Sequence, residues 1–124
     1  IFGELFGYLE SLKGNQAQEM VEMLFDTNYM DTKQTAVASA LVIYSGGHSE
    51  IADLLRCWVQ DIESGMTSVL KKAYESESSD NLQDVAAGVL GIYFNVDSLE
   101  VLGHMVEFRD RSKRGALRLI ETLS

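Results

Sequence analysis

Apolar residues recur at helical spacing along the whole chain, and no proline interrupts them. Proline is the strongest breaker of helices, so its absence over 124 residues permits long helices and leaves ten glycines as the main breaks. No segment alternates in the manner of a half-buried strand. The pattern predicts an all-α domain with short connections and antiparallel neighbouring helices. We expect seven or eight helices, at 2–13, 15–27, 31–45, 49–64, 66–75, 80–96 and 97–111, with 112–124 as an eighth or as a prolongation of the seventh.

Capping residues and glycines set the expected helix ends. An acidic or small polar residue followed three places later by glutamine or glutamate is typical of a helix N-terminus. Glycine just past an apolar stripe is typical of a C-terminus. Glycines inside a helix weaken it, so Gly88 and Gly91 are predicted to lie where another backbone comes close. The expected starts are Asn15 with Gln18, Asp31 with Gln34, Ser49, Asp80 with Gln83 and Asp97 with Glu100, and the expected breaks are Gly14, Gly46-Gly47 and Gly65.

The chain also matches itself at an offset of 49 residues. The match keeps capping residues as well as core positions, which a shared leucine pattern alone does not explain. It predicts a single domain, 1–124, in which helix 1 is a cap, 15–64 and 64–111 are two three-helix repeats, and 112–124 is a C-terminal helix. The identical pairs are Asp31/Asp80, Gln34/Gln83, Ala38/Ala87, Leu41/Leu90, Ile43/Ile92, Tyr44/Tyr93 and Ser49/Ser98.

The stretch QDVAAGVLGIYFNVDSLEVLGHMVEFRD, residues 83–110, contains paired alanines Ala86-Ala87, then Leu90-Gly91, a turn and an inward Leu102. Together with the three-helix unit, these residues make the chain similar to the armadillo/HEAT family of helical repeats over about residues 15–110. The resemblance implies a right-handed superhelical repeat that binds other proteins and carries no chemistry of its own. A tetratricopeptide-like arrangement and a single closed helical bundle remain as alternatives.

Composition narrows the classes of partner. A net charge of −9 makes nucleic acid or an anionic membrane surface a poor first choice. No stretch approaches the apolar length of a membrane span, and the opening IFGELFGYLESL lacks the basic lead of a signal peptide. The first residue, Ile1, indicates a processed form or a piece of a longer chain. A single cysteine, Cys57, excludes an internal disulfide or a thiolate zinc site and favours a reducing, cytoplasmic setting.

Two charged surfaces are predicted to bind a partner. The first is a late basic cluster, which could receive an acidic partner or phosphate, although basic residues also complement a helix C-terminus. The second is the polar back of the expected helix 49–64. The partner is expected to be another protein, and a homo-oligomer is possible. The residues concerned are Arg109, Arg111, Lys113 and Arg114, followed by Arg118, in the cluster, and Glu50, Asp53, Arg56 and Gln60 on the helix back.

No catalytic, cofactor or metal site is predicted. His48 and Ser49 are adjacent and cannot form a nucleophile–base pair with Asp53 without a dedicated scaffold. Cys57 is expected to pack against another layer. The chain is therefore predicted to be a non-enzymatic protein-interaction module. The alternatives are a small bundle with a pocket for an apolar ligand, or a metal protein that uses Glu100, His104 and Glu107, which would need ligands from a facing helix.

Overall fold

A computed structural model describes residues 7–9, 16–26, 46–99, 102–103 and 105–124. Within these ranges every regular element is helical and no strand occurs, so the all-α prediction is confirmed. The expected helix 31–45 lies outside the described residues, as do its cap, Asn15 and the residues Glu100 and His104. Residues 7–9 are helical as well. The longer helices are α2 (Gln16–Leu24), α4 (Ser49–Ala73), α5 (Ser79–Leu99) and α6 (Val106–Glu121).

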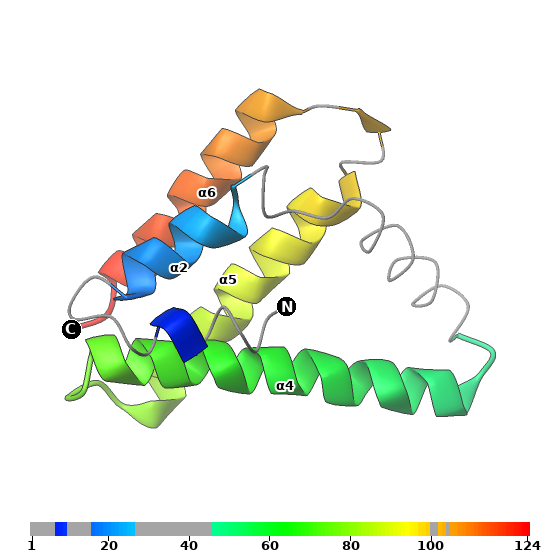
Figure 1. Cartoon of the computed structure of the whole chain (residues 1–124), viewed down its shortest axis with the longest axis horizontal. Coiled ribbons are helices and arrows are strands. Elements are labelled where there is room, and N and C mark those ends of the chain that lie inside the picture. Colours follow the sequence, from blue (N-terminus) through cyan, green and yellow to red (C-terminus); the bar gives the residue numbers. More distant parts are fainter. Residues whose placement is uncertain (1–6, 10–15, 27–45, 100–101, 104) are drawn as a thin grey trace.

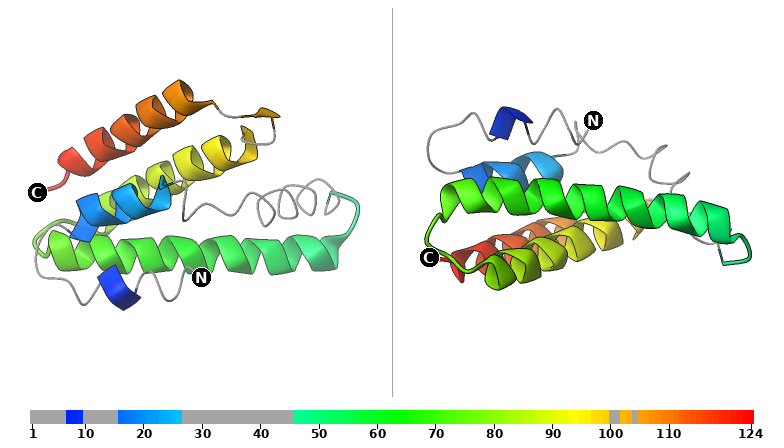
Figure 2. Two further views of the ribbon diagram at one scale, coloured as in Figure 1. Left: turned by 45° about the horizontal axis from the view of Figure 1, so that its top comes forward. Right: turned by 90° about the horizontal axis from the view of Figure 1, so that it is seen from below.

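The four helices pack as a ring rather than as a row. α4 and α5 are joined by a short loop and contact each other, and α5 also contacts α6. The first of the four, α2, then contacts both α4 and α6. α2 and α6 therefore lie side by side although they come from opposite ends of the described chain (Figures 1 and 2).

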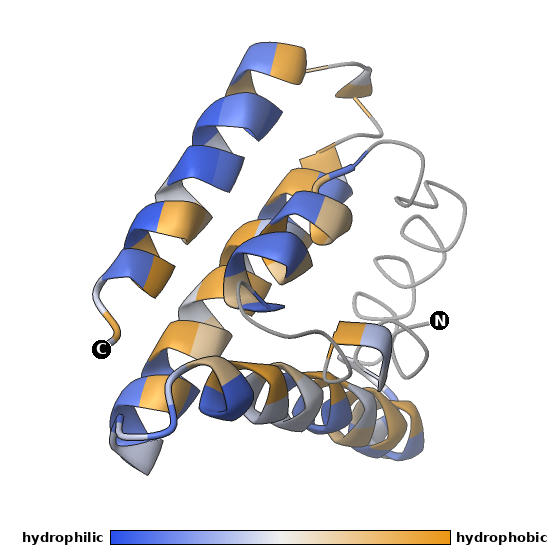
Figure 3. Ribbon diagram, turned by 60° about the vertical axis from the view of Figure 1, so that its left-hand side comes forward, coloured by the Kyte–Doolittle hydropathy of each residue, from blue (hydrophilic) through white to orange (hydrophobic). Residues whose placement is uncertain are grey.

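The core lies where these helices face one another. α5 contributes more buried apolar residues than any other described helix, and its apolar positions run along nearly its whole length (Figure 3). Phe25, just after α2, contacts Tyr93 of α5 edge-on, with ring centroids 6.0 Å apart at 86°. Burial of this apolar surface, at about 25 cal/mol per Å², is the main favourable term that holds the helices together. The largest fully buried side chains are Leu9, Met20, Leu24, Met66, Leu70, Leu82 and Ile120.

The predicted break at Gly65 is wrong, because α4 is one helix of 25 residues that passes through this glycine. Glycine costs a helix interior about 1 kcal/mol relative to alanine. On either side of it, Ile62, Met66 and Val69 are buried in the core. Burying a large apolar side chain contributes about 1.5–3 kcal/mol, so packing outweighs the local cost and keeps the helix continuous.

The predicted helix start at Asp97 is also wrong. α5 continues to Leu99, and Asp97 is buried in its last turns. Ser98 is inside the helix, where its hydroxyl donates a hydrogen bond to the carbonyl oxygen of Phe94 at 2.7 Å. Ser49, its predicted equivalent, begins α4 instead. The next helix starts at Val106 and crosses Ser112, so 112–121 prolongs it, and the predicted helix count and superhelical repeat are not confirmed.

Two further local predictions need correction. The side chain that caps α5 is Ser78, whose Oγ accepts a hydrogen bond from the backbone N–H of Asn81 at 3.2 Å, so Asp80 already lies within the helix. Gly88 does lie at a close approach, but to a side chain: an added Cβ would sit 3.0 Å from Cδ1 of Leu119. At Gly91 no atom of the described residues lies within 4 Å of such a Cβ.

Candidate partner-binding surfaces

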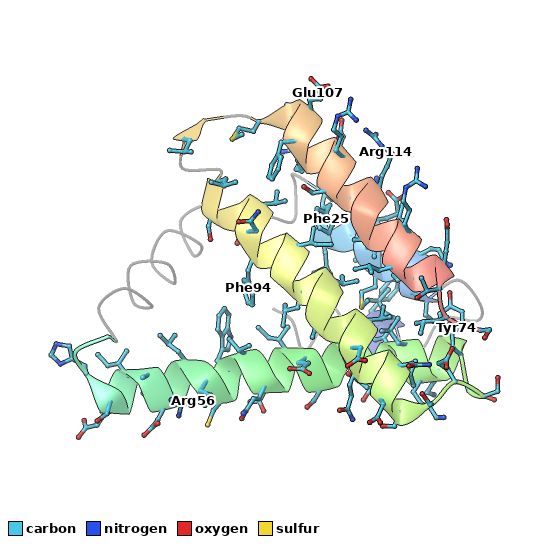
Figure 4. The ribbon with its side chains drawn as sticks, turned by 180° about the vertical axis from the view of Figure 1, so that it is seen from behind. Phe25, Arg56, Tyr74, Phe94, Glu107 and Arg114 are labelled. Atoms are coloured by element: carbon cyan, nitrogen blue, oxygen red, sulfur yellow. The ribbon has the colours of Figure 1, made fainter. Side chains whose placement is uncertain are left out.

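The structure divides the predicted basic cluster into two sets. Arg111, Arg114 and Arg118 recur at helical spacing on the exposed side of α6, and Figure 4 shows Arg114 pointing away from the bundle. Arg111 forms an ion pair of 3.3 Å with Glu107 one turn earlier, and both side chains are well exposed. Such a pair contributes only about 0.3–0.5 kcal/mol, so it leaves Arg111 available to a partner.

The inner set points toward the rest of the molecule. Lys113 forms an ion pair with Glu22 of α2, and both side chains are partly exposed. Arg109 is half-buried near the start of α6. Lys113 therefore joins α6 to α2, and the outward arginines are the part of the cluster that a partner could reach.

The four residues predicted for the polar back of α4 are all exposed: Glu50, Asp53, Arg56 and Gln60. Asp53 and Arg56 form an exposed ion pair of 2.6 Å. Gln60 follows at the same helical spacing and borders a shallow surface depression between α4 and α5. That depression is lined by polar side chains and gives no support to an apolar-ligand pocket. Its lining residues are Gln60, Glu63, Ser64, Thr67 and Gln83.

The two predicted surfaces do not meet. The polar back follows α4 along one edge of the molecule, whereas the arginines follow α6 along another (Figures 1 and 4). The principal neighbours of both helices are α2 and α5, which lie between them. A single partner helix would therefore not contact both sets of residues.

The sequence analysis missed a third surface, which we call the α4 apolar face: Ile51, Leu54, Leu55 and Trp58. Their helical spacing is typical of a stripe that faces a core, yet the buried residues of α4 begin only at Ile62. The side chain of Leu54 is 72% exposed, and that of Trp58 is 39% exposed. The first half of α4 extends past the other described helices in Figure 1. Its apolar stripe spans about two turns, in which Leu54 and Trp58 are exposed and Ile51 and Leu55 are half-buried.

An aromatic pair marks where this face meets the bundle. The rings of Trp58 and Phe94 lie 5.8 Å apart at 44°. Phe94 points from α5 toward α4 in Figure 4 and packs against the core on its other side. The pair joins α4 to α5, and Trp58 is still partly exposed beside it. A second exposed apolar group, Leu102, Met105 and Val106, surrounds the start of α6, so the predicted inward position of Leu102 is wrong.

Acidic side chains flank the α4 apolar face. Glu50 lies one turn before Leu54, and Asp61 lies one turn after Trp58; both are exposed. Residues 49–63 carry four carboxylates against one guanidinium, that of Arg56, which is bound to Asp53. The charged residues of the neighbouring α5 are all aspartates. These charges were visible in the sequence, but the exposure of the apolar stripe between them was not.

The residues considered for chemistry are scattered. His48 and Ser49 are exposed at the start of α4, while the carboxylate of Asp53 is bound to Arg56. Cys57 is exposed, so the expectation that it packs against another layer is wrong. No group of three potential metal-ligating side chains occurs among the residues that could be described. The same part of the chain contains no helix long and apolar enough to cross a membrane.

Comparison with known proteins gives no information on function. No family model, no curated protein and no solved structure matches this chain.

Proposed function

We propose that this chain is a non-enzymatic protein-interaction module that binds its partner through the α4 apolar face. The observation that carries the proposal is the exposure of Leu54 and Trp58 on a helix whose other half lies in the core. Contiguous exposed apolar side chains on a folded domain are typical of interaction sites. Tryptophan is also enriched among the residues that contribute most to binding at protein interfaces.

The arrangement of helices favours the closed bundle over the superhelical repeat as the scaffold for this surface. In an open helical array each unit contacts only its neighbours, so the first and last helices stay apart. Here α2 packs against α6. A closed bundle would hold the second half of α4 rigidly and present the first half as an arm.

The outward arginines of α6 provide a second, independent contact surface within the same proposal. Arg111 and Arg114 are exposed on one side of a helix, where they could bind carboxylates of an acidic partner. The cytoplasm is the proposed compartment, because the chain has a single cysteine and needs no disulfide.

Affinity capture with two surface variants tests the proposal. The immobilised wild-type protein should retain one or more proteins from a cell extract that L54K/W58A loses. E75K/E121K serves as the matched surface control, because it changes two exposed residues that belong neither to the α4 apolar face nor to the outward arginines of α6. Both variants should keep the wild-type circular dichroism spectrum and unfold cooperatively. If L54K/W58A retains the same proteins in the same amounts, the α4 apolar face is not the binding surface.

A further inference from the structure

The shape and spacing of the α4 apolar face suit a helical partner. Its residues recur at i, i+3, i+4 and i+7, which is the spacing by which one helix packs against another. The exposed half of α4, residues 49–61, spans about 20 Å at 1.5 Å per residue. A partner helix of about three to four turns would cover it.

The charged residues around the α4 apolar face favour a partner helix of one sign of charge. Glu50 and Asp61 are exposed at its two ends. Within residues 49–63 the one lysine or arginine is Arg56, which already binds Asp53 at 2.6 Å. Because the charged residues of α5 are all aspartates, that neighbour offers nothing to neutralise these carboxylates. An acidic partner would be repelled, whereas lysines and arginines would meet complementary charge.

The exposed indole adds a second reason for a basic partner. Trp58 contacts Phe94 and is 39% exposed. An aromatic face attracts a lysine or arginine side chain by about 0.5–1 kcal/mol at exposed sites. The same ring can bury the apolar side of the partner, so it suits a helix that is apolar on one side and basic on its flanks.

We propose that the α4 apolar face binds a basic amphipathic helix of another protein, with Leu54 and Trp58 packed against its apolar side and Glu50 and Asp61 paired with its lysines or arginines. This inference rests on the proposed function and narrows it to one class of partner. The assignment follows from the juxtaposition of an exposed apolar stripe with carboxylates at both ends.

The only tryptophan in the chain lies in this face, so its fluorescence reports binding directly. The probes are three synthetic 14-residue peptides with leucines at the same helical spacing and with lysine, glutamate or glutamine at the remaining positions. The leucine–lysine peptide should shift the Trp58 emission saturably and bind at least about tenfold more tightly than the leucine–glutamate peptide. Its affinity should fall as salt is raised, because the pairing carboxylates are exposed.

Two charge-reversed variants distinguish a local effect from the net charge of −9. E50K/D61K should lower the affinity for the leucine–lysine peptide by about tenfold or more. E75K/E121K, which makes the same change in charge at exposed positions away from this face, should leave the affinity within about twofold of wild type. Equal losses in the two variants would overturn the proposal, because attraction would then be non-specific.

Other results separate this inference from the proposed function. If all three peptides bind equally well, the partner need not be basic, while an apolar docking surface remains supported. If no peptide changes the emission and L54K/W58A also captures the wild-type set of proteins, both proposals are wrong. If sedimentation shows self-association that R111E/R114E abolishes, the occupant is α6 of a second copy and the inference of another protein is wrong.

Discussion

At the scale of single residues, Glu77 connects the loop between α4 and α5 to the end of the described chain. Its carboxylate accepts hydrogen bonds from the backbone N–H of Ser124 at 3.0 Å, the side-chain amide of Asn81 at 2.9 Å and the backbone N–H of Ser78 at 3.0 Å. These bonds, that from Ser124 first, hold the pKa of Glu77 below its ordinary value because they favour the charged form.

The lowered pKa of Glu77 predicts a pH-dependent effect of E77Q. A carboxylate with a folded pKa below its unfolded value stabilises the protein above the unfolded pKa and loses this contribution as pH falls through the folded pKa. E77Q should therefore be less stable than wild type at about pH 7, and the difference should narrow toward about pH 3. Urea unfolding at both pH values measures it. A difference that stays constant with pH, or an equal effect of E75Q in the same loop, would contradict this account.

Substitution by alanine is predicted to have different effects on stability at Gly88 and at Gly91. G91A should raise the free energy of unfolding by about 0.5–1 kcal/mol, because alanine restricts the unfolded chain and a Cβ at this position meets nothing within 4 Å. G88A should bring no such gain, because its Cβ would lie 3.0 Å from Leu119. Urea unfolding of the two variants provides the comparison. Equal stabilisation by both would mean that Leu119 moves aside freely.

At the scale of elements, the periodicity of the sequence identified which side of a helix is apolar. It was less reliable for how much of the helix the rest of the protein buries. The apolar stripe that recurs at helical spacing in the sequence of α5 is buried at six positions: Leu82, Val85, Ala86, Val89, Leu90 and Tyr93. In α4 the stripe is equally regular, but burial begins only at Ile62. A sequence pattern shows which side of a helix is apolar, whereas the position of the neighbouring helices determines which of those apolar residues are buried. Single glycines and polar residues did not end the helices as predicted, because α4 continues through Gly65 and α5 continues through Asp97.

The division of α4 predicts unequal effects of the same truncation along one helix. L70A should lower the free energy of unfolding by about 2–5 kcal/mol, because Leu70 is fully buried and its loss leaves a cavity. L54A should change it by no more than about 0.5 kcal/mol, since the Leu54 side chain is 72% exposed. Urea unfolding at constant m-value measures both. A loss at Leu54 similar to that at Leu70 would show that the α4 apolar face is covered within the free protein.

At the scale of the whole molecule, the sequence was sufficient for the all-α class but not for the way the helices close. The internal match at 49 residues pairs Ser49 with Ser98, yet one begins a helix and the other lies near the end of one. A few identical residues at a fixed offset therefore do not show that the two segments occupy equivalent positions in the fold. The contact of α2 with α6 joins segments far apart in sequence, and such a contact has no local signal. The predicted surface residues had the right exposure on α4, but the pairing of Lys113 with Glu22 depended on that same long-range contact.

The contact between α2 and α6 makes a prediction that distinguishes a closed bundle from an open array. Ala116, Ile120 and Leu123 are buried where α6 and the end of the chain cover α2 and α5. A chain that ends after Met105 should therefore lose cooperative thermal unfolding and more helical circular dichroism than α6 alone accounts for. I120A, which keeps the whole chain, should unfold in one cooperative step at a free energy about 2–5 kcal/mol lower. In an open array each unit depends mainly on its neighbours, so removal of the last helix would leave the remainder folded. A shortened chain that still unfolds cooperatively, with only a proportionate loss of helix, would favour the array over the bundle.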